Sequence, residues 1–169
     1  MNGIDPTPSQ ACGEKTGRED DAPVEKERGG LVLSFDGGLL DADFIHRFLT
    51  EESYWAKNIT RRRLDRAIEH SLCVGVYDGG RQVAFARAVT DRATFAWLAD
   101  VFVAAEYRRR GIASWMVEAM LKEPDLEGLR LWLLGTRDAH AVYAGKGFAP
   151  VAYPERFMWI FRPHRPEDP

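Results

Sequence analysis

The sequence predicts an α/β (α+β) fold with a mixed, mainly antiparallel central sheet flanked by helices. Three strand-like runs follow one another through tight turns, at 73–77, 82–89 and 95–103. The first two are joined by Asp78-Gly79-Gly80-Arg81, which is typical of a β-hairpin. Helical and strand patterns then alternate along the rest of the chain. A meander followed by βαβ-type crossovers gives a mixed sheet with helices on both faces.

The composition is that of one soluble globular domain. The chain has 169 residues, of which 45% are hydrophobic, and this suffices for one core. Its net charge of −3 argues against a chain built to bind nucleic acid. We find no apolar run long enough to span a membrane and no signal peptide. Because Cys12 and Cys73 have neither disulfide nor metal-ligand spacing, we expect a cytoplasmic protein without a metal.

The domain boundaries follow from the distribution of apolar residues. Residues 1–30 are polar and almost free of large apolar side chains, so we expect a flexible N-terminal tail. The patterned sequence at 31–162 is expected to form the single domain. The proline-rich residues 163–169 are expected to be a C-terminal tail.

The first half of the domain is predicted to hold one strand and two helices before the meander. The strand at 31–35 ends in the turn 36–38. Asp41 and Thr60 precede the two helices, and each can cap one. Apolar residues recur at helical spacing behind both caps, at Phe44, Ile45, Phe48 and Leu49, and at Leu64, Ala67, Ile68 and Leu72.

The second half is predicted to be helix, strand, helix and strand. A helix begins near Ile112, and an almost wholly apolar strand follows at 129–134. Thr136 can cap a second helix that carries Tyr143 and is closed by the glycines of 145–148. We expect a last strand at 157–161.

The link between the strand at 95–103 and the helix after it is the most informative stretch. It contains Arg108-Arg109-Arg110-Gly111-Ile112-Ala113. Such a turn directs backbone N–H groups and a helix N-terminus at one place, which favours an anion such as phosphate. Taken alone, the turn could equally be a solvated connection.

The motifs together resemble the GCN5-related N-acetyltransferase (GNAT) superfamily, over roughly 31–161. The signature Gln/Arg-x-x-Gly-x-Gly/Ala matches Arg108–Ala113, and Tyr143 followed by Gly147-Phe148 matches a second family feature. The resemblance implies an acyl-CoA N-acyltransferase-like fold. Arg109 and Ala113 stand where relatives often have glycine, and Arg109 is acceptable if its φ is negative.

The resemblance implies that acetyl-CoA is the co-substrate, with no metal required. The turn would hold its pyrophosphate, and the preceding strand would hold the pantetheine arm through its backbone. This use of the strand requires it to part from its neighbour, which a bulge near Ala99-Asp100 would allow. The implied cofactor-binding residues are Val101, Phe102, Val103, Arg108, Arg109, Arg110, Gly111, Ile112, Ala113 and Ser114.

Two residues are candidates for the chemistry. Tyr143 matches the family position that faces the sulfur and would donate a proton to the leaving thiolate, although it could instead be a core tyrosine. Asp100 lies in the strand that is expected to hold the pantetheine arm. It would accept the amine proton, or it could satisfy backbone groups at a bulge. His140, three residues before Tyr143, is the second candidate for the base.

The part of the site that binds the acetyl acceptor is expected to include Tyr54, Trp55 and Trp97. These residues could bind an apolar group or a cationic amine, or they could be core residues. The predicted function is direct acetyl transfer to a primary amine of a small molecule or peptide. The alternative is a non-catalytic acyl-CoA-binding sensor or interaction module. A module that binds nucleic acid through the arginines at 61–63 and 108–110 is a weaker hypothesis. The sequence leaves open whether the protein forms a homodimer.

Overall fold

The computed structural model describes residues 25–165, and this part of the chain forms one six-stranded sheet in the order β1-β2-β3-β4-β5-β6. Sequential strands pair antiparallel as far as β5, and β6 joins β5 in parallel. The mixed, mainly antiparallel sheet is therefore as expected. The strands are β1 (Lys26–Arg28), β2 (Leu31–Ser34), β3 (Leu72–Asp78), β4 (Arg81–Thr90), β5 (Phe95–Val103) and β6 (Leu131–Leu133).

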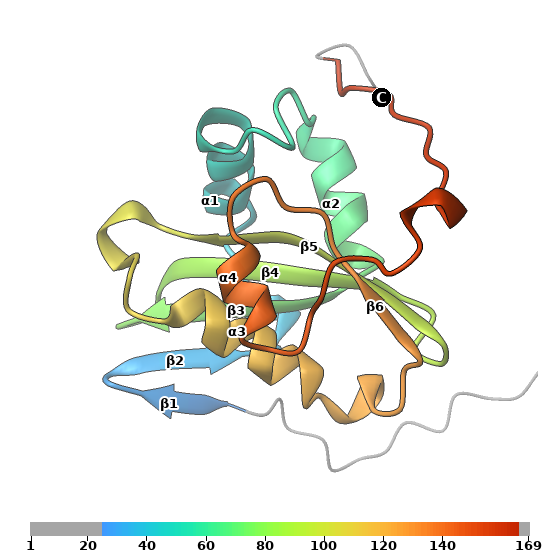
Figure 1. Ribbon diagram of the computed structural model, residues 1–169. Coiled ribbons are helices and arrows are strands. Elements are labelled where there is room, and N and C mark those ends of the chain that lie inside the picture. Colours follow the sequence, from blue (N-terminus) through green and yellow to red (C-terminus); the bar gives the residue numbers. More distant parts are fainter. Residues whose placement is uncertain (1–24, 166–169) are drawn as a thin grey trace, which may run out of the picture.

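Helices cover both faces of the sheet (Figure 1). They are α1 (Ala42–Arg47), which continues as the π-helical turn η2 (Phe48–Glu52), α2 (Arg61–Glu69), α3 (Ile112–Leu121) and α4 (His140–Ala144). Short 3₁₀ turns occur at Gly37–Leu39, Ala105–Tyr107, Pro124–Leu126 and Pro154–Arg156. No helix in the described part of the chain is both long and apolar enough to cross a membrane.

Two of the three predicted helix caps form, at the starts of α1 and α2. The prediction for Thr136 is wrong, because the N-cap of α4 is Ala139, which makes no side-chain cap hydrogen bond. The Asp41 carboxylate accepts the N–H of Phe44 at 2.9 Å, and the Thr60 hydroxyl accepts that of Arg63 at 3.4 Å. Each side chain thereby satisfies a backbone donor that the first helical turn cannot pair internally. α1 and α2 therefore begin where the capping residues place them.

Two apolar clusters fill the layers between sheet and helices. The larger one joins the sheet to α3 and includes Val74, Leu98 and Met116. The smaller one joins the opposite face to α1 and α2 and includes Phe85 and Phe102. Two separately filled layers are what a sheet with helices on both faces requires.

The structure departs from expectation at both ends of the domain. Lys26–Arg28, which we expect in the tail, pairs with β2 as β1, and residues 1–24 lie outside the described part of the chain. The expected strand at 157–161 is wrong for this structure, because these residues form no strand. A 3₁₀ turn at Pro154–Arg156 precedes them, and the segment then runs away from the sheet (Figure 1).

Candidate active site

The site begins where β5 loses its partner on one side. β5 and β6 pair from Phe95 opposite Leu131 to Trp97 opposite Leu133. β6 ends there, whereas β5 continues to Val103. The outer edge of Leu98–Val103 therefore has no strand beside it in the described chain. Its backbone donors and acceptors can pair with an extended ligand, as in strand addition.

A bulge lies in the same part of β5. Phe102 lies opposite Phe85 and Ala99 opposite Arg87, so Asp100 and Val101 together oppose one residue of β4. The expected bulge near Ala99-Asp100 is thus present, and Asp100 has the unusual φ of 51°. The extra residue changes which side chains face α3. Leu98 packs into the larger core before the bulge, and Val101 and Val103 do so after it.

The bulge turns the Asp100 carboxylate inward, where both of its oxygens are hydrogen-bonded. Oδ2 accepts from Nε of Arg87 at 2.5 Å, and Oδ1 accepts from Nε1 of Trp55 at 3.0 Å. The side chains of Asp100 and Arg87 are only 7% and 16% exposed. The sequence does not by itself reveal the role of Arg87, although an arginine in the otherwise apolar run at 83–89 of β4 is a signal that it has a buried partner.

The turn at 108–111, which the sequence predicts to bind phosphate and which we therefore call the phosphate turn, ends at the N-terminus of α3. Gly111 is the N-cap with a φ of 76°, and its carbonyl accepts the N–H of Trp115 at 3.0 Å. The N–H groups of the first helical turn lie ahead of this first internal bond, so they are available to an anion. Arg109 has a φ of 63°, so the condition of a negative φ, under which arginine would fit this position without strain, is not met. Two left-handed residues, at 109 and 111, tighten the turn.

Two of the three turn arginines support the turn itself. Nε of Arg108 donates to the carbonyl of Val103 at 3.0 Å, and its Nη2 lies 3.3 Å from the Glu52 carboxylate. Arg110 donates to the carbonyl of Glu106 at 3.2 Å, and its guanidinium covers the Tyr107 ring. Only part of each guanidinium is engaged in these contacts, so both charges and several N–H donors remain near the turn.

Arg28 adds a positive charge that the sequence reasoning did not anticipate. Its Nη2 lies 3.5 Å from where a Cβ on Gly111 would stand, so the guanidinium lies against the phosphate turn. We find no hydrogen bond or ion pair from the Arg28 side chain to any other residue within 25–165. Arg28 was missed because it lies in the polar segment expected to be a tail, and only the pairing of β1 with β2 brings it here.

Tyr143 lies on α4 and is fixed by the turn that follows it. The N–H of Phe148 donates to the Tyr143 carbonyl at 3.2 Å, and the two rings lie 6.0 Å apart edge to face. Gly147, with a φ of 92°, permits this reversal. Burial raises the pKa of the Tyr143 phenol, with smaller contributions from Tyr54 and Asp138. The phenol is therefore protonated at neutral pH and can donate.

The aromatic residues expected on the acceptor side are all partly exposed. Tyr54 and Trp55 contact each other edge to face, and Trp55 also binds Asp100. The N–H of Arg137 donates to the Tyr54 hydroxyl at 2.9 Å, and its guanidinium lies 3.8 Å from the Tyr54 ring centre. Trp97, at the last β5–β6 pair, is 40% exposed and is not a core residue.

Two other residues weighed from the sequence show no feature that favours a catalytic role. His140 is exposed at the start of α4. Cys73 is buried, which raises the pKa of its thiol to about 12 and makes it a poor nucleophile at neutral pH. The described residues contain no cluster of metal-ligating side chains.

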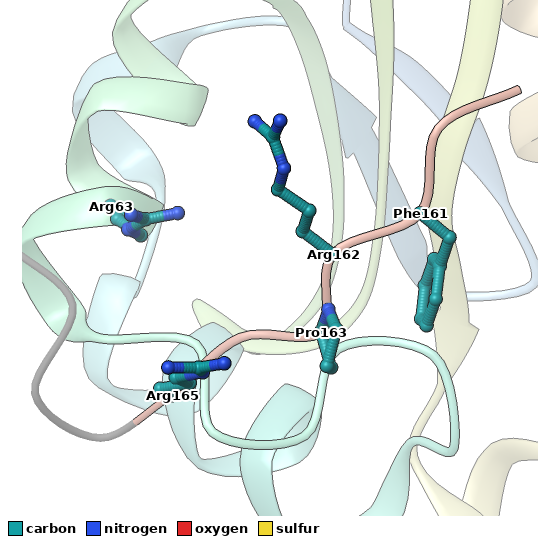
Figure 2. Close-up of a pocket in the computed structure, with 5 residues that line it drawn as sticks. All are labelled: Arg63, Phe161, Arg162, Pro163 and Arg165. Carbon is teal, nitrogen blue, oxygen red and sulfur yellow. The ribbon is translucent and has the colours of Figure 1, made fainter.

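Away from β5, a hollow lies between α2 and the C-terminal segment (Figure 2). Arg162 extends into it from that segment, and Arg63 comes from α2. None of the residues that line it is among those described above for β5, the phosphate turn or α4: Arg63, Phe161, Arg162, Pro163 and Arg165.

Comparison with known proteins decides the family. Residues 41–148 match the profile of the acetyltransferase (GNAT) family, and this range includes β5, the phosphate turn and α4. The chain belongs to the GNAT acetyltransferase family. Its fold and its activity as an N-acetyltransferase, with acetyl-CoA as co-substrate, are thereby confirmed. The roles of individual residues remain predictions.

Individual relatives agree with this assignment. A crystal structure from Xanthomonas campestris pv. campestris, named as a GNAT acetyltransferase, is 46% identical, with a TM-score of 0.78 over 82% of this chain and 97% of that one. A Gibberella zeae protein named as an acetyltransferase is 29% identical over 70% of this chain and 78% of its own length. A Clostridium acetobutylicum structure with acetyl-CoA, 15% identical, shares the fold at a TM-score of 0.59 over 78% and 94% of the two chains.

Proposed function

We propose that this GNAT enzyme transfers the acetyl group of acetyl-CoA directly to a primary amine of a small molecule or peptide. The observation that carries the proposal is the free outer edge of β5, which leads from the bulge at Asp100 to the phosphate turn. An extended ligand on this edge has its phosphates at the N-terminus of α3 and its far end beside Asp100. The pyrophosphate, pantetheine arm and thioester of acetyl-CoA have this order.

The phosphates would be held mainly by backbone N–H groups of Ile112, Ala113 and Ser114 at the start of α3. Arg109 and Arg28 would supply charge, together with Arg108 and Arg110, whose guanidinium groups are only partly engaged with protein oxygens. Gly111 lets the phosphate approach the backbone closely. The backbone of Val101, Phe102 and Val103 would pair with the amide groups of the pantetheine arm, as an added strand does.

In the reaction, the amine nitrogen attacks the thioester carbon, the C–S bond breaks, and the amine loses one proton. Tyr143 would donate the proton that the departing thiolate takes up, since its raised pKa keeps the phenol protonated. A backbone N–H of Val101 or Val103 would stabilise the oxyanion. Asp100 would receive the amine proton through water, because Arg87 and Trp55 already contact its oxygens but leave lone pairs free.

The acceptor would approach past Trp55 and Trp97. The face of Tyr54 that meets Arg137 is occupied, so cation–π binding of an ammonium group would fall to the two indoles. This arrangement would suit an amine next to an apolar or aromatic group. Tyr54 would contribute by fixing the position of Trp55.

Steady-state kinetics with an amine panel tests the proposal. For direct transfer, we expect double-reciprocal plots that intersect when acetyl-CoA and the best amine are varied together. No acetylated enzyme should be seen by mass spectrometry after incubation with acetyl-CoA alone. Parallel plots with an acetylated residue would contradict direct transfer. Tight acetyl-CoA binding with no turnover on any amine would favour the binding-module alternative.

A further inference from the structure

The loop that joins β6 to α4, residues 134–139, lies against the aromatic residues expected to meet the acceptor. A Cβ on Gly135 would stand 3.7 Å from the indole ring of Trp97. Two residues later, the backbone N–H of Arg137 donates to the Tyr54 hydroxyl at 2.9 Å. The loop is thus held in place by contacts with two of these three aromatic side chains.

The Arg137 side chain is stacked on the ring of Tyr54. Its Cζ lies 3.8 Å from the ring centre, which is the separation of a stacked guanidinium. A stacked guanidinium uses its flat face in this contact, so the N–H groups at its edge remain available to hydrogen-bond acceptors. The side chain is 66% exposed, so a ligand can reach this edge.

The neighbouring carboxylate of Asp138 engages only a small part of the Arg137 edge. Its Oδ2 lies 3.5 Å from Nη2 of Arg137, which is long for a hydrogen bond. Both side chains are mostly exposed, so this ion pair is weak. Within 25–165 we find no other hydrogen bond or ion pair from the Arg137 guanidinium. Arg137 therefore presents a positioned, planar set of N–H donors.

Contacts through Tyr54 place Arg137 on the acceptor side of the site. Tyr54 contacts Trp55 with their ring centres 5.0 Å apart, and Trp55 in turn binds Asp100 at the bulge of β5. Burial raises the pKa of the Tyr143 phenol and Tyr54 raises it further, so Tyr54 also lies near Tyr143. The phosphate turn lies beyond the other end of the free β5 edge. An anion at Arg137 is therefore not a phosphate of coenzyme A.

We propose that Arg137 binds a carboxylate group of the acetyl acceptor, so that the preferred acceptor is an amino acid rather than a simple amine. This inference rests on the acetyl transfer proposed above and names its substrate class. The edge of a guanidinium pairs with both oxygens of a carboxylate in one plane. The indoles of Trp55 and Trp97 meet the apolar part of the acceptor. A phosphate dianion fits less well, because the Asp138 carboxylate beside Arg137 repels the additional charge.

Pairs of acceptors that differ only in the carboxylate test the proposal. L-Phenylalanine is compared with phenethylamine, L-leucine with isoamylamine, and δ-aminovaleric acid with butylamine, so that the spacing between amine and carboxylate also varies. We expect kcat/KM for the best acid to exceed that of its partner by about tenfold to 100-fold, which is the contribution of a charge-assisted hydrogen-bonded pair. Arg137→Gln should remove most of this preference, whereas Arg137→Lys, which keeps the charge without the planar edge, should retain part of it.

The matched control is Arg156→Gln, because Arg156 also stacks on a tyrosine, with its Cζ 4.0 Å from the ring centre of Tyr153. This control should keep the parent's preference for the acid. The thermal midpoint of Arg137→Gln should equal that of the parent, since the Arg137 side chain is exposed. A folded Arg137→Gln protein that retains the preference, or that loses rate equally with both members of every pair, would overturn the proposal.

Binding to the protein saturated with coenzyme A separates a failure of this inference from a failure of the proposed transfer. Titration calorimetry with each acid and its partner amine requires no turnover. Acid-selective binding that depends on Arg137, without acetylation, would support the carboxylate site and contradict the transfer. Acetylation with no preference for acids would contradict the carboxylate site and leave the transfer standing. The absence of both selective binding and turnover in all pairs would overturn the proposal.

Discussion

The Asp100 carboxylate and the Arg87 guanidinium form an almost buried ion pair at the bulge of β5, with Oδ2 2.5 Å from Nε. Asp100 can make this contact because the bulge places it at a φ of 51°, which turns its side chain toward β4. The same bulge lies where the outer edge of β5 is free. The bulge therefore places a nearly buried charged pair beside the free edge of the strand.

Removing one partner of this pair should destabilise the fold strongly. Asp100→Ala would leave the Arg87 charge uncompensated in a nearly buried site, so we expect the free energy of unfolding to fall by about 3–5 kcal/mol. Arg87→Met combined with Asp100→Ala should recover much of this loss. Urea unfolding of both single variants and the double variant measures the coupling.

A matched control is Asp125→Ala, which breaks the exposed pair with Arg92. That change should leave the unfolding midpoint almost where it is. An Asp100→Ala protein as stable as the parent would show that the buried pair contributes little.

Tyr143→Phe should lower kcat by about 100-fold, at the low end of what a general acid supplies, while the Kd for acetyl-CoA stays within twofold.

The parent's rate should decline as alkaline pH rises past the raised pKa of the phenol, because the proton donor is then lost. The variant should lack that decline. Pre-steady-state and pH–rate measurements check both points. The exposed Tyr153→Phe is the control, and an equal kcat in both variants would make Tyr143 a packing residue.

Arg28→Gln should weaken coenzyme A binding about threefold to fivefold, because an exposed charge contact contributes up to about 1 kcal/mol. The effect should grow at low ionic strength, where the charge is less screened. Titration calorimetry at two salt concentrations measures it. Arg62→Gln, an exposed arginine on α2, should have no effect. Equal affinity of Arg28→Gln and the parent at low salt would remove Arg28 from the phosphate site.

Glu118→Gln should loosen α4, because Glu118 on α3 bonds Lys146 just beyond α4 at 2.7 Å. Hydrogen bonds from Lys122 and Lys146 lower the pKa of Glu118 to about 2. A lowered pKa contributes stability above the ordinary value, about 4.3, and this contribution disappears as pH falls toward 2. The variant should therefore lose less stability than the parent between pH 5 and 2.

Unfolding free energies across that pH range test the contribution of Glu118 to stability. Because α4 carries Tyr143, kcat at neutral pH tests whether loosening α4 also affects the proposed proton donor. Glu127→Gln, which is exposed after the Pro124–Leu126 turn, is the control and should follow the parent's pH dependence. If Glu118→Gln also followed it, the contacts of Glu118 with Lys122 and Lys146 would contribute little to stability.

Local features of the site could be predicted from the sequence because neighbouring residues encode them. The hairpin at Asp78–Arg81, the caps at Asp41 and Thr60, and the extent of β5 all agree with expectation. Each depends on a turn propensity, a side chain that reaches a nearby N–H, or a run of β-forming residues. The motif at Arg108–Ala113 followed by Tyr143 and Phe148 was enough to indicate the family.

The partners of the key groups were decided only by the tertiary structure. Asp100 meets Trp55 from the α1–α2 connection, and Arg28 reaches Gly111 from the first strand of the sheet. Such contacts depend on sheet order, on the bulge and on how β1 pairs, none of which leaves a local pattern. The segment at 157–161 shows that a local pattern can also predict an element that the structure lacks. Its residues favour a strand, but a strand forms only where a neighbouring edge accepts its backbone hydrogen bonds, and its own chain leads it away from one.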